Sequence, residues 1–395
     1  MKYTLGLINP GDMLKGIQGG STGFIKSILP YLNSNRVIIF GISKTNATPW
    51  KSSFIYKNVE FVPICSLKYP SRIPMRLKAF LNYMRYRKRI LNSGVDALYI
   101  QTPECCIPFL YGNTGIPVIY HQHGSGNPVA LSRFFYARRF FFQGLFELIL
   151  MIIYRYSDWI IAIDKLCLAK AIKNGARRKT TLLMNAIDTQ EFRPNKTYRI
   201  KTRHRFGIKA NHNSILFVGR IVKTKGPARL LKCIPFLRKE GIPFQMFFAG
   251  DGSYMPYMKN YVTKNKNEDC VNLLGHVPHE DLPYYYNMAD VVVLPSDMEG
   301  VPMVVLEALA CGTPVVASSV GGIPDIIEQG KNGMLVENLS AENLASSIIQ
   351  TLALKNDRKN IADTVSKFSA TRFVFWLNDI IQTVMEKKLS ASKSF

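Results

Sequence analysis

The sequence predicts an α/β protein with two Rossmann-like domains, each a doubly wound parallel sheet. Three observations lead to this prediction. The chain has 395 residues, too many for one ordinary hydrophobic core and suited to two domains of roughly 200 residues each. Short, branched apolar runs alternate with longer helical segments, as in sheets whose parallel strands are joined by helices. This alternation stops in a polar stretch and then begins again.

The expected strands are apolar runs bounded by turn residues. In the first half they are residues 3–10, 36–43, 97–102, 117–123 and 158–164. In the second half they are residues 213–220, 244–251, 271–277, 290–296 and 314–318. Open α/β sheets bind ligands outside the carboxyl ends of their strands, so two such sheets facing each other predict a central ligand-binding crevice.

The polar stretch between the two halves predicts the domain boundary. Residues 193–213 are basic and have no apolar period, which is typical of a linker. We therefore expect one domain at 1–195 and a second at 196–370. A periodic apolar segment at 373–388 lies beyond the second sheet, and we expect a C-terminal helix of about 371–395 to join the first domain.

The net charge is unevenly distributed. The chain carries +24 overall. Residues 1–195 hold 26 Lys and Arg against 9 Asp and Glu, a net +17, and residues 196–395 hold 25 against 18, a net +7. A basic face of this size attracts nucleic acid, anionic lipid or phosphorylated substrates, although a merely solvated basic surface is the alternative.

The cysteines and the longest apolar run indicate the redox compartment and whether the chain could span a membrane. Seven cysteines without a C-x-x-C pair indicate neither a disulfide framework nor a zinc site, which fits a reducing cytoplasm. The N-terminus reads as a strand and not as a signal peptide. The run from Phe140 to Tyr154 contains Gln143 and Glu147 and is shorter than the about 20 apolar residues of a membrane span. It predicts a core or interfacial helix.

Two carboxylates flank an expected strand-to-helix junction. Glu299 lies in the loop after strand 290–296, Pro302 is suited to the first position of the next helix, and Glu307 lies further along that helix. Free backbone N–H groups near Gly300 to Met303 can bind an anion. The pair can thus hold two polyol groups of one ligand, or Glu299 can simply face the helix dipole while Glu307 is solvated.

Cations and glycines follow other strands. Gly219 and Arg220 end a strand and Lys225 follows, so two cations can bind a diphosphate, although such pairs are often only surface features. The turn with Gly19 and Gly20 allows close backbone approach to a phosphate or sugar. It has neither the full dinucleotide pattern nor the P-loop Lys-Ser/Thr.

Two histidines end the strand at 117–123. Strand alternation places His121 and His123 on one face and Gln122 on the other. His123 is nearer the strand end and is the stronger candidate for the site, although a lone histidine is often structural.

Taken in series, these motifs resemble the family-4 group of GT-B glycosyltransferases over nearly the whole chain. The matching elements occur in the family's order. They are Gly19–Gly20, His123–Gly124, NAIDTQEFRP (185–194), VGRIVKTKG (218–226), AGDGSY (249–254), LLGHVPHEDLPYYYNMADVVVLPS (273–296), the E-x7-E pair Glu299 and Glu307, and CGTPVVASSVGGIPDII (311–327). Two positions depart from the family pattern, because Ala186 replaces a usual Gly and Asp164 stands where small polar residues are common.

The resemblance implies a retaining transferase with an N-terminal acceptor domain and a C-terminal nucleotide-sugar donor domain. Arg220 and Lys225 would neutralise the diphosphate, Glu299 would hold the donor sugar, Glu307 would bind the ribose, and His123 would contact the sugar. The residues implied in catalysis are His123, Arg220, Lys225 and Glu299. Those implied in substrate binding are Gly19, Gly20, Gly219, Arg220, Lys225, Val277, Glu299, Gly300, Val301, Pro302 and Glu307.

The resemblance also implies that no metal and no separate cofactor are needed, and the sequence has no Asp-x-Asp metal motif. No protein nucleophile stands out, so the donor phosphate is the expected base in a front-face substitution. The donor is expected to be a UDP-sugar.

The acceptor is inferred from two basic, aromatic segments. Residues 68–90 carry eight cations and no acid, and residues 131–146 have a similar mixture. Such segments suit an anionic membrane surface and also nucleic acid. In a glycosyltransferase they favour a lipid-linked glycan acceptor, no nucleic acid, and a peripheral position on the cytoplasmic face of the membrane in cell-surface glycan synthesis such as lipopolysaccharide or capsule.

Two other functions remain open at this point. A GT-B sugar-nucleotide epimerase would share the fold, but the E-x7-E pair with Arg220 and Lys225 favours transfer. A basic nucleic-acid-binding protein would explain the charge but would leave the strand-end motifs without a purpose. The oligomeric state, the sugar and the linkage are not indicated by the sequence.

Overall fold

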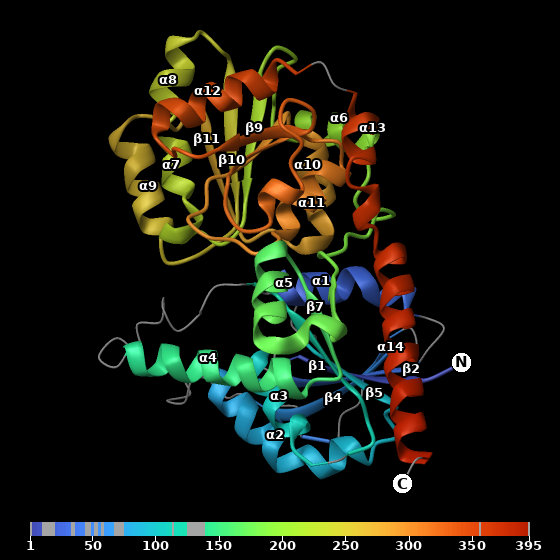
Figure 1. Cartoon of the computed structure of the whole chain (residues 1–395). Helices are drawn as coiled ribbons and strands as arrows, with labels where there is room; N and C mark the ends of the chain where they lie inside the picture. The colour runs from blue at the N-terminus through green and yellow to red at the C-terminus, as the bar shows by residue number, and fades with distance from the viewer. Residues whose placement is uncertain are drawn as a thin grey trace. The chain divides into compact units, whose positions relative to one another are not determined.

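The computed structural model describes residues 2–9, 20–32, 36–43, 49–50, 54–56, 59–66, 75–112, 114–124, 139–354 and 357–393. The chain forms two compact units (Figure 1). Unit 1 comprises Met1–Asn185 and Ala370–Phe395, and unit 2 comprises Ala186–Ser369. The boundary thus lies between Asn185 and Ala186, upstream of the expected residue 195.

Unit 1 is built on a twisted sheet of mostly parallel strands. Its strands are β1 (Thr4–Ile8), β2 (Arg36–Ser43), β3 (Phe54–Tyr56), β4 (Val59–Ser66), β5 (Ala97–Ile100), β6 (Val118–Gln122), β7 (Trp159–Ala162) and β8 (Thr180–Leu182). The order is β3-β4-β2-β1-β5-β6-β7-β8, and only the β3–β4 pair is antiparallel. The five strands predicted in this half are confirmed, while β3, β4 and β8 were not predicted.

Helices cover both faces of this sheet (Figure 1). They are α1 (Gly20–Ile28), α2 (Met75–Leu91), α3 (Pro103–Leu110), α4 (Arg139–Tyr156), α5 (Lys165–Ala171) and α14 (Ala370–Lys393). One face packs against α2, α3 and α4, whose Tyr83, Phe109 and Tyr154 enter the same buried cluster as Tyr120 of β6. On the other face α1 and α14 meet.

Helix α14 belongs to unit 1 although it ends the chain. Its apolar side chains recur at helical spacing, and Phe373, Leu377 and Ile381 are buried. The Tyr3 hydroxyl hydrogen-bonds Asn378, and Lys388 lies 3.3 Å from Asp158.

The predicted apolar helix near 140–154 is α4. It buries Leu150, Ile153 and Tyr154 and leaves Leu145, Leu148 and Met151 exposed. None of the helices in the described part of the chain has the length and apolarity that crossing a membrane requires.

Unit 2 has a fully parallel sheet. Its strands are β9 (Asn213–Val218), β10 (Phe244–Ala249), β11 (Val271–Gly275), β12 (Val291–Leu294), β13 (Val315–Ser318) and β14 (Gly333–Val336), in the order β11-β10-β9-β12-β13-β14. The five predicted strands of this half are confirmed, and β14 is additional. The helices are α6 (Lys196–Arg205), α7 (Pro227–Leu231), α8 (Ile234–Lys239), α9 (Met255–Lys264), α10 (Leu282–Met288), α11 (Met303–Ala310), α12 (Ala341–Leu352) and α13 (Arg358–Asp363).

The stretch 193–213, predicted as a linker between the domains, contains helix α6 and lies within unit 2. Its Arg199 and Arg203 reach the same carboxylate, that of Asp290 before β12, at 2.5 and 3.0 Å. Asn195 caps the helix by accepting from Tyr198 N. Because ion pairs and aromatic contacts rather than an apolar stripe hold α6 to unit 2, the sequence pattern did not reveal it.

Candidate functional site

The strand order of unit 2 reverses between β9 and β12. From β9 the chain proceeds outward through β10 and β11, and from β12 it proceeds the other way through β13 and β14. All pairs are parallel, so the carboxyl ends of the strands lie on one edge. The strand order thus runs outward in opposite directions from β9 and from β12, and such switch points bind ligands. Arg220 and Lys225 follow β9, and Glu299 follows β12.

The loop after β9 is held against the loop after β12. Asp297 N donates to Thr224 O at 2.9 Å. Gly226 has φ +69°, and a Cβ at this position would lie 2.0 Å from Pro295 O, so only glycine allows the approach. These backbone contacts bring together the two loops that carry the predicted charges.

Lys225 and Glu299 form an ion pair. Lys225 Nζ lies 2.6 Å from Glu299 Oε1, and the two side chains are 25% and 7% exposed. The sequence placed these residues in one site, and the structure puts them in direct contact. Arg220 is exposed and forms no ion pair with a residue that the structure describes.

Tight backbone packing fixes the position of Arg220. Gly219 has φ +147°, and its carbonyl oxygen would lie 1.8 Å from a Cβ on Gly250, which follows the adjacent strand β10. Gly219 N donates to Ala249 O at 3.0 Å. The third strand in this direction, β11, is followed by Val277, which is half-buried.

The segment after Glu299 is fixed by the double glycine of the next loop. Gly322 N donates to Gly300 O at 2.7 Å, and a Cβ on Gly321 would lie 2.1 Å from Glu299 O. Val301 is buried. Helix α11 begins at Met303 with Pro302 as its N-cap, so the expectation that Pro302 opens the helix is off by one residue.

Glu307 is not a solvated helix residue. It is 2% exposed. The Tyr286 hydroxyl donates to its Oε2 at 2.6 Å, and His279 Nε2 lies 3.1 Å from its Oε1. Burial, followed by the charge of Glu307, raises the pKa of Tyr286 well above its usual value, so the hydroxyl remains a donor. His279 and Tyr286 were not predicted as site residues. His279 lies in the turn before α10 and Tyr286 within α10, where the sequence pattern does not distinguish them from residues of ordinary packing.

The unit 1 candidates lie at the carboxyl edge of its own sheet. His121 and His123 face α1 and α14, with ring centroids 5.3 and 5.4 Å from Phe24. Gln122 faces the other way and accepts from Tyr154 at 2.8 Å. The predicted alternation of these three residues is therefore confirmed.

His123 is held neutral by its surroundings. Burial lowers the pKa of His123 to about 4, while a hydrogen bond with the side chain of Asn185, after β8, opposes the shift. His121 is buried and lies 2.5 Å from the Tyr99 hydroxyl through Nδ1, and burial lowers its pKa further. Gly20 is the first residue of α1, and Gly19 lies outside the described residues.

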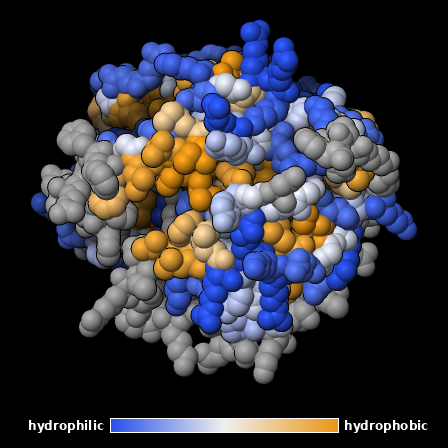
Figure 2. Space-filling view, turned by 60° about the horizontal axis from the view of Figure 1, so that its bottom comes forward, coloured by the Kyte–Doolittle hydropathy of each residue, from blue (hydrophilic) through white to orange (hydrophobic). Residues whose placement is uncertain are grey.

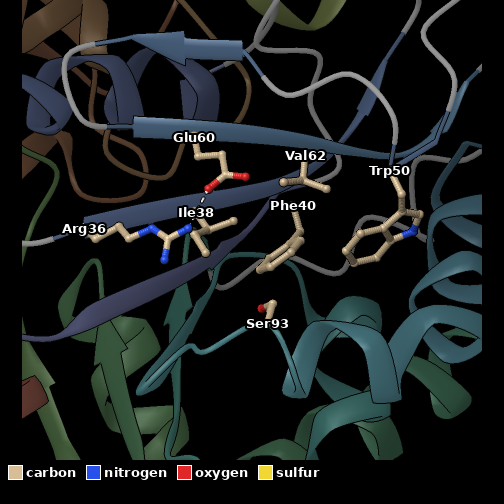
Figure 3. Close-up of a pocket in the computed structure, with 7 residues that line it drawn as sticks. All are labelled: Arg36, Ile38, Phe40, Trp50, Glu60, Val62 and Ser93. Atoms are coloured by element: carbon tan, nitrogen blue, oxygen red, sulfur yellow. Dashed lines mark hydrogen bonds and ion pairs between the residues drawn. The ribbon is translucent and has the colours of Figure 1, made fainter.

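A cavity of about 190 Å³ opens elsewhere in unit 1 (Figure 3). Its lining residues are Arg36, Ile38, Phe40, Trp50, Glu60, Val62 and Ser93. Arg36 opens β2 and pairs with Glu60 near the start of β4 at 3.0 Å. The cavity thus begins at the amino ends of the strands, whereas the predicted site residues follow carboxyl ends.

Comparison with known proteins identifies the family. The model described as "Glycosyl transferases group 1" matches residues 199–368, and the model described as "Glycosyltransferase Family 4" matches residues 19–191. An uncharacterized glycosyltransferase of Methanocaldococcus jannaschii is 28% identical over 322 residues, 80% of this chain and 81% of that protein. A GDP-mannose-dependent phosphatidylinositol monomannoside mannosyltransferase of Mycolicibacterium smegmatis is 30% identical over 174 residues, 42% of this chain and 45% of the relative.

Solved structures share the fold. Sucrose-phosphate synthase from Thermosynechococcus elongatus has a TM-score of 0.81 at 19% identity and covers 98% of this chain and 100% of its own. Anabaena HepE in complex with UDP-glucose has a TM-score of 0.67 at 18% identity, with 100% of both chains covered. Together with the two family models, which match successive parts of the chain, these likenesses show that the chain belongs to the group 1 glycosyltransferases of the GT-B fold.

Proposed function

We propose that this glycosyltransferase moves a sugar from a nucleotide-diphosphate sugar, with retention of anomeric configuration, to a lipid-linked glycan at the membrane surface. The observation that carries the donor half of the proposal is the contact between Lys225 and Glu299 at the switch point of unit 2, with Arg220 exposed on the same edge. The guanidinium of Arg220 and the ammonium of Lys225 can bind the diphosphate, and the carboxylate of Glu299 can accept a hydrogen bond from the sugar.

The charges divide the chemistry between them. Negative charge develops on the diphosphate as the sugar–oxygen bond breaks, and preorganised cations stabilise it. Arg220 can bind two phosphate oxygens at once, and Lys225 acts as a point charge. Glu299 orients Lys225 and has a second oxygen for a sugar hydroxyl. The donor phosphate is the base that accepts the proton of the attacking hydroxyl.

Glu307 is the proposed ribose ligand. Each carboxylate oxygen has two lone pairs. Oε1 and Oε2 of Glu307 can therefore accept hydrogen bonds from ribose hydroxyls and retain their hydrogen bonds with His279 and Tyr286. The Anabaena protein, which shares the fold, was solved in complex with UDP-glucose, and this supports UDP as the nucleotide. The mycobacterial relative is GDP-mannose-dependent, so GDP is the alternative to be tested.

A nucleotide titration tests the donor site. A nucleotide that binds only the native state raises the melting temperature, and we expect UDP and its sugars to do so. Arg220→Ala and Lys225→Ala should each lower kcat by about 100- to 1000-fold, since each removes a charge-stabilising group. Lys223→Ala is the matched control, because Lys223 lies in the same turn and is exposed.

Two results would contradict this proposal. One is that neither UDP, GDP nor their sugars stabilise the protein. The other is that Lys223→Ala lowers kcat as much as Lys225→Ala, which would mean that a general loss of positive charge and not a defined site is responsible. Conversion of the nucleotide sugar to an isomer without an acceptor would indicate an epimerase instead.

The surface of unit 1 supports a membrane-bound acceptor. On α2 the side chains of Leu77, Leu81 and Met84 recur at i, i+4 and i+7 and are 45–50% exposed. Exposed Arg85 and Lys88 lie on the same helix. Figure 2 turns forward the side of Figure 1 that carries α2, and hydrophobic residues gather there with hydrophilic ones around them. Such a surface suits the interface of an anionic membrane, where a lipid-linked acceptor is found.

A further inference from the structure

The carboxyl edge of the unit 1 sheet carries polar atoms that are buried but unused. Thr102 follows β5, His123 follows β6 and Asp164 follows β7, and these three strands are neighbours. Thr102 Oγ1, His123 Nε2 and Asp164 Oδ2 are buried and make no hydrogen bond within the part of the chain that the structure describes. Because buried polar groups are nearly always hydrogen-bonded, three such atoms on one edge indicate a place for the polar groups of a ligand.

Asp164 is the strongest of the three. The residue is 1% exposed. Its Oδ1 accepts from Cys167 N at 2.6 Å and caps α5. The Cys167 thiol hydrogen-bonds the Asp164 side chain, and burial, followed by the charge of Asp164, raises the pKa of the thiol well above its usual value. A thiol is only a weak donor, so Oδ2 has no strong partner.

Capping alone does not account for a carboxylate here. A cap needs one oxygen, and Ser or Asn provides it as well as Asp does; Ser340 caps α12 in this way. The aspartates at the opposite edge of the same sheet differ from Asp164 because they reach solvent: Asp96 is exposed and Asp158 is half-buried. Asp96 accepts from Thr4 N at 2.6 Å, and Asp158 accepts from Val118 N at 2.8 Å and pairs with Lys388. A buried charge with an unused oxygen is unfavourable unless a ligand completes it.

The chemistry of the three groups selects the ligand. A carboxylate only accepts hydrogen bonds and repels phosphate. Thr102 is the N-cap of α3 but does not use its hydroxyl for capping, and neutral His123 can donate or accept through Nε2. Hydroxyl groups both donate and accept, so they match all three. In the register of β5, β6 and β7, Thr102 and Asp164 continue the face of Gln122, and His123 continues the opposite face. The three groups therefore lie on the two sides of the edge that a ligand above the strand ends would contact.

We propose that Asp164 is a specificity-determining residue that binds a sugar hydroxyl through Oδ2, with Thr102 and His123 binding further hydroxyls. The inference rests on the proposed glycosyl transfer. The hydroxyl belongs either to the acceptor glycan or to the donor sugar, which share this chemistry.

The experiment uses the full-length protein and the variants Asp164→Ser and Asp164→Asn, both of which retain a capping oxygen. Asp357→Asn is the matched control, since Asp357 caps α13 in unit 2 by accepting from Lys359 N at 3.3 Å. Affinities are measured for UDP, GDP and their sugars. Saturation-transfer NMR then follows the methyl glycosides of glucose, galactose, mannose and N-acetylglucosamine on protein saturated with nucleotide.

Two arms distinguish the source of the hydroxyl. Loss of a hydrogen bond to a charged group weakens binding by about 10- to 100-fold. If the hydroxyl is on the donor, Asp164→Ser should weaken binding of the nucleotide sugar by this factor and leave the free nucleotide unchanged. If the hydroxyl is on the acceptor, the free nucleotide and the nucleotide sugar should both bind Asp164→Ser normally, and the saturation-transfer signal of the methyl glycosides should be lost.

The proposal is overturned if Asp164→Ser binds every ligand within twofold of the wild type, or if the wild-type protein binds nucleotide but shows no contact with any sugar. It is also overturned if the Asp164 variants lose ligand binding together with a fall in melting temperature, and Asp357→Asn shows the same loss and the same fall. Failure of the wild type to bind any nucleotide would instead remove the proposed function itself, so the two failures are distinct.

Discussion

Among single residues, Glu307 has two duties that a substitution can separate. Glu307→Ala leaves the buried Tyr286 hydroxyl without its acceptor, and we expect the free energy of unfolding to fall by about 1–3 kcal/mol. Glu307→Gln keeps an oxygen for Tyr286 and should be closer to the wild type in stability, but its amide should bind ribose less well. Urea unfolding and UDP titration of both variants measure the two effects. Wild-type affinity in Glu307→Gln would show that Glu307 is structural only.

A second prediction concerns pH. The pKa of His123 is lowered from 6.5 to about 4, so between these values the unfolded chain binds more protons than the folded one. Stability should therefore fall as pH drops through this window, by about 1–2 kcal/mol between pH 6.5 and 5 from this residue. His121 shifts in the same direction. His123→Gln should flatten the pH dependence of urea unfolding, whereas His204→Gln, which removes an exposed histidine, should not. If the free energy of unfolding has the same slope against pH in the wild type, His123→Gln and His204→Gln, the prediction is wrong.

Residue-level reasoning from the sequence was most successful where charge follows a strand. Lys225 and Glu299 were predicted to share a site because each lies just past a strand end, and they are in contact. The same reasoning missed His279 and Tyr286, because their role depends on which side chain is buried opposite Glu307. That information is tertiary. It also could not show that Asp164 would be left with an unused oxygen.

At the level of elements, a glycine contact connects two strand ends of the candidate donor site. Gly250→Ala would place a Cβ 1.8 Å from Gly219 O, so the backbone before Arg220 must move. Gly330 also has a positive φ, +73°, but open space around it, so Gly330→Ala reports the backbone strain alone. We expect Gly250→Ala to lose about 1–3 kcal/mol more in the free energy of unfolding than Gly330→Ala, and to bind UDP more weakly. Similar values for the two variants would show that the loop adapts without cost.

Ten strands could be predicted because their apolar runs are continuous and bounded by turns. Strand β4 was missed because Pro63 and Glu60 interrupt its apolar run. The sheet tolerates Pro63 where the register with β2 shifts between Gly41 and Ile42, and the Pro63 carbonyl accepts from Trp50 N. Strands β3 and β8 have only three residues each, too few for a recognisable pattern. Strand β14 is as long as β5, but it begins with Gly333, which leaves an apolar run of three residues.

On the scale of the whole molecule, both sheets have a point at which the strand order reverses. In unit 1 the order reverses between β1 and β5, and in unit 2 between β9 and β12. The sequence shows this repeat as two successive series of strands and helices, so the fold class could be predicted. The expected attachment of the C-terminal helix to the first domain agrees with the division of the chain, in which α14 belongs to unit 1. Its individual contacts, such as that of Lys388 with Asp158, are encoded by no local pattern.

The uneven charge of the chain leads to the last prediction, which concerns membranes. The protein should bind vesicles that contain phosphatidylglycerol and should be released by salt, because charge attraction is screened over about 10 Å at 0.1 M ionic strength. Arg85 and Lys88 of α2 are exposed, whereas Arg87 donates to Pro108 O at 2.6 Å and so fixes α2 to the end of α3. Reversing Arg87 would therefore mix folding with binding.

The informative variant is Arg85→Glu with Lys88→Glu, and the matched control is Lys232→Glu with Lys239→Glu in unit 2, which removes equal charge from another exposed surface. Each basic residue near an anionic surface contributes about 1 kcal/mol, so the α2 variant should bind at least about tenfold more weakly in vesicle sedimentation, while UDP affinity stays unchanged. If the control variant loses as much, the attraction comes from net charge and not from the α2 face. If neither loses binding, and vesicles of neutral lipid bind equally well, then the exposed apolar residues of α2 and α4 hold the protein to the membrane and the cations do not.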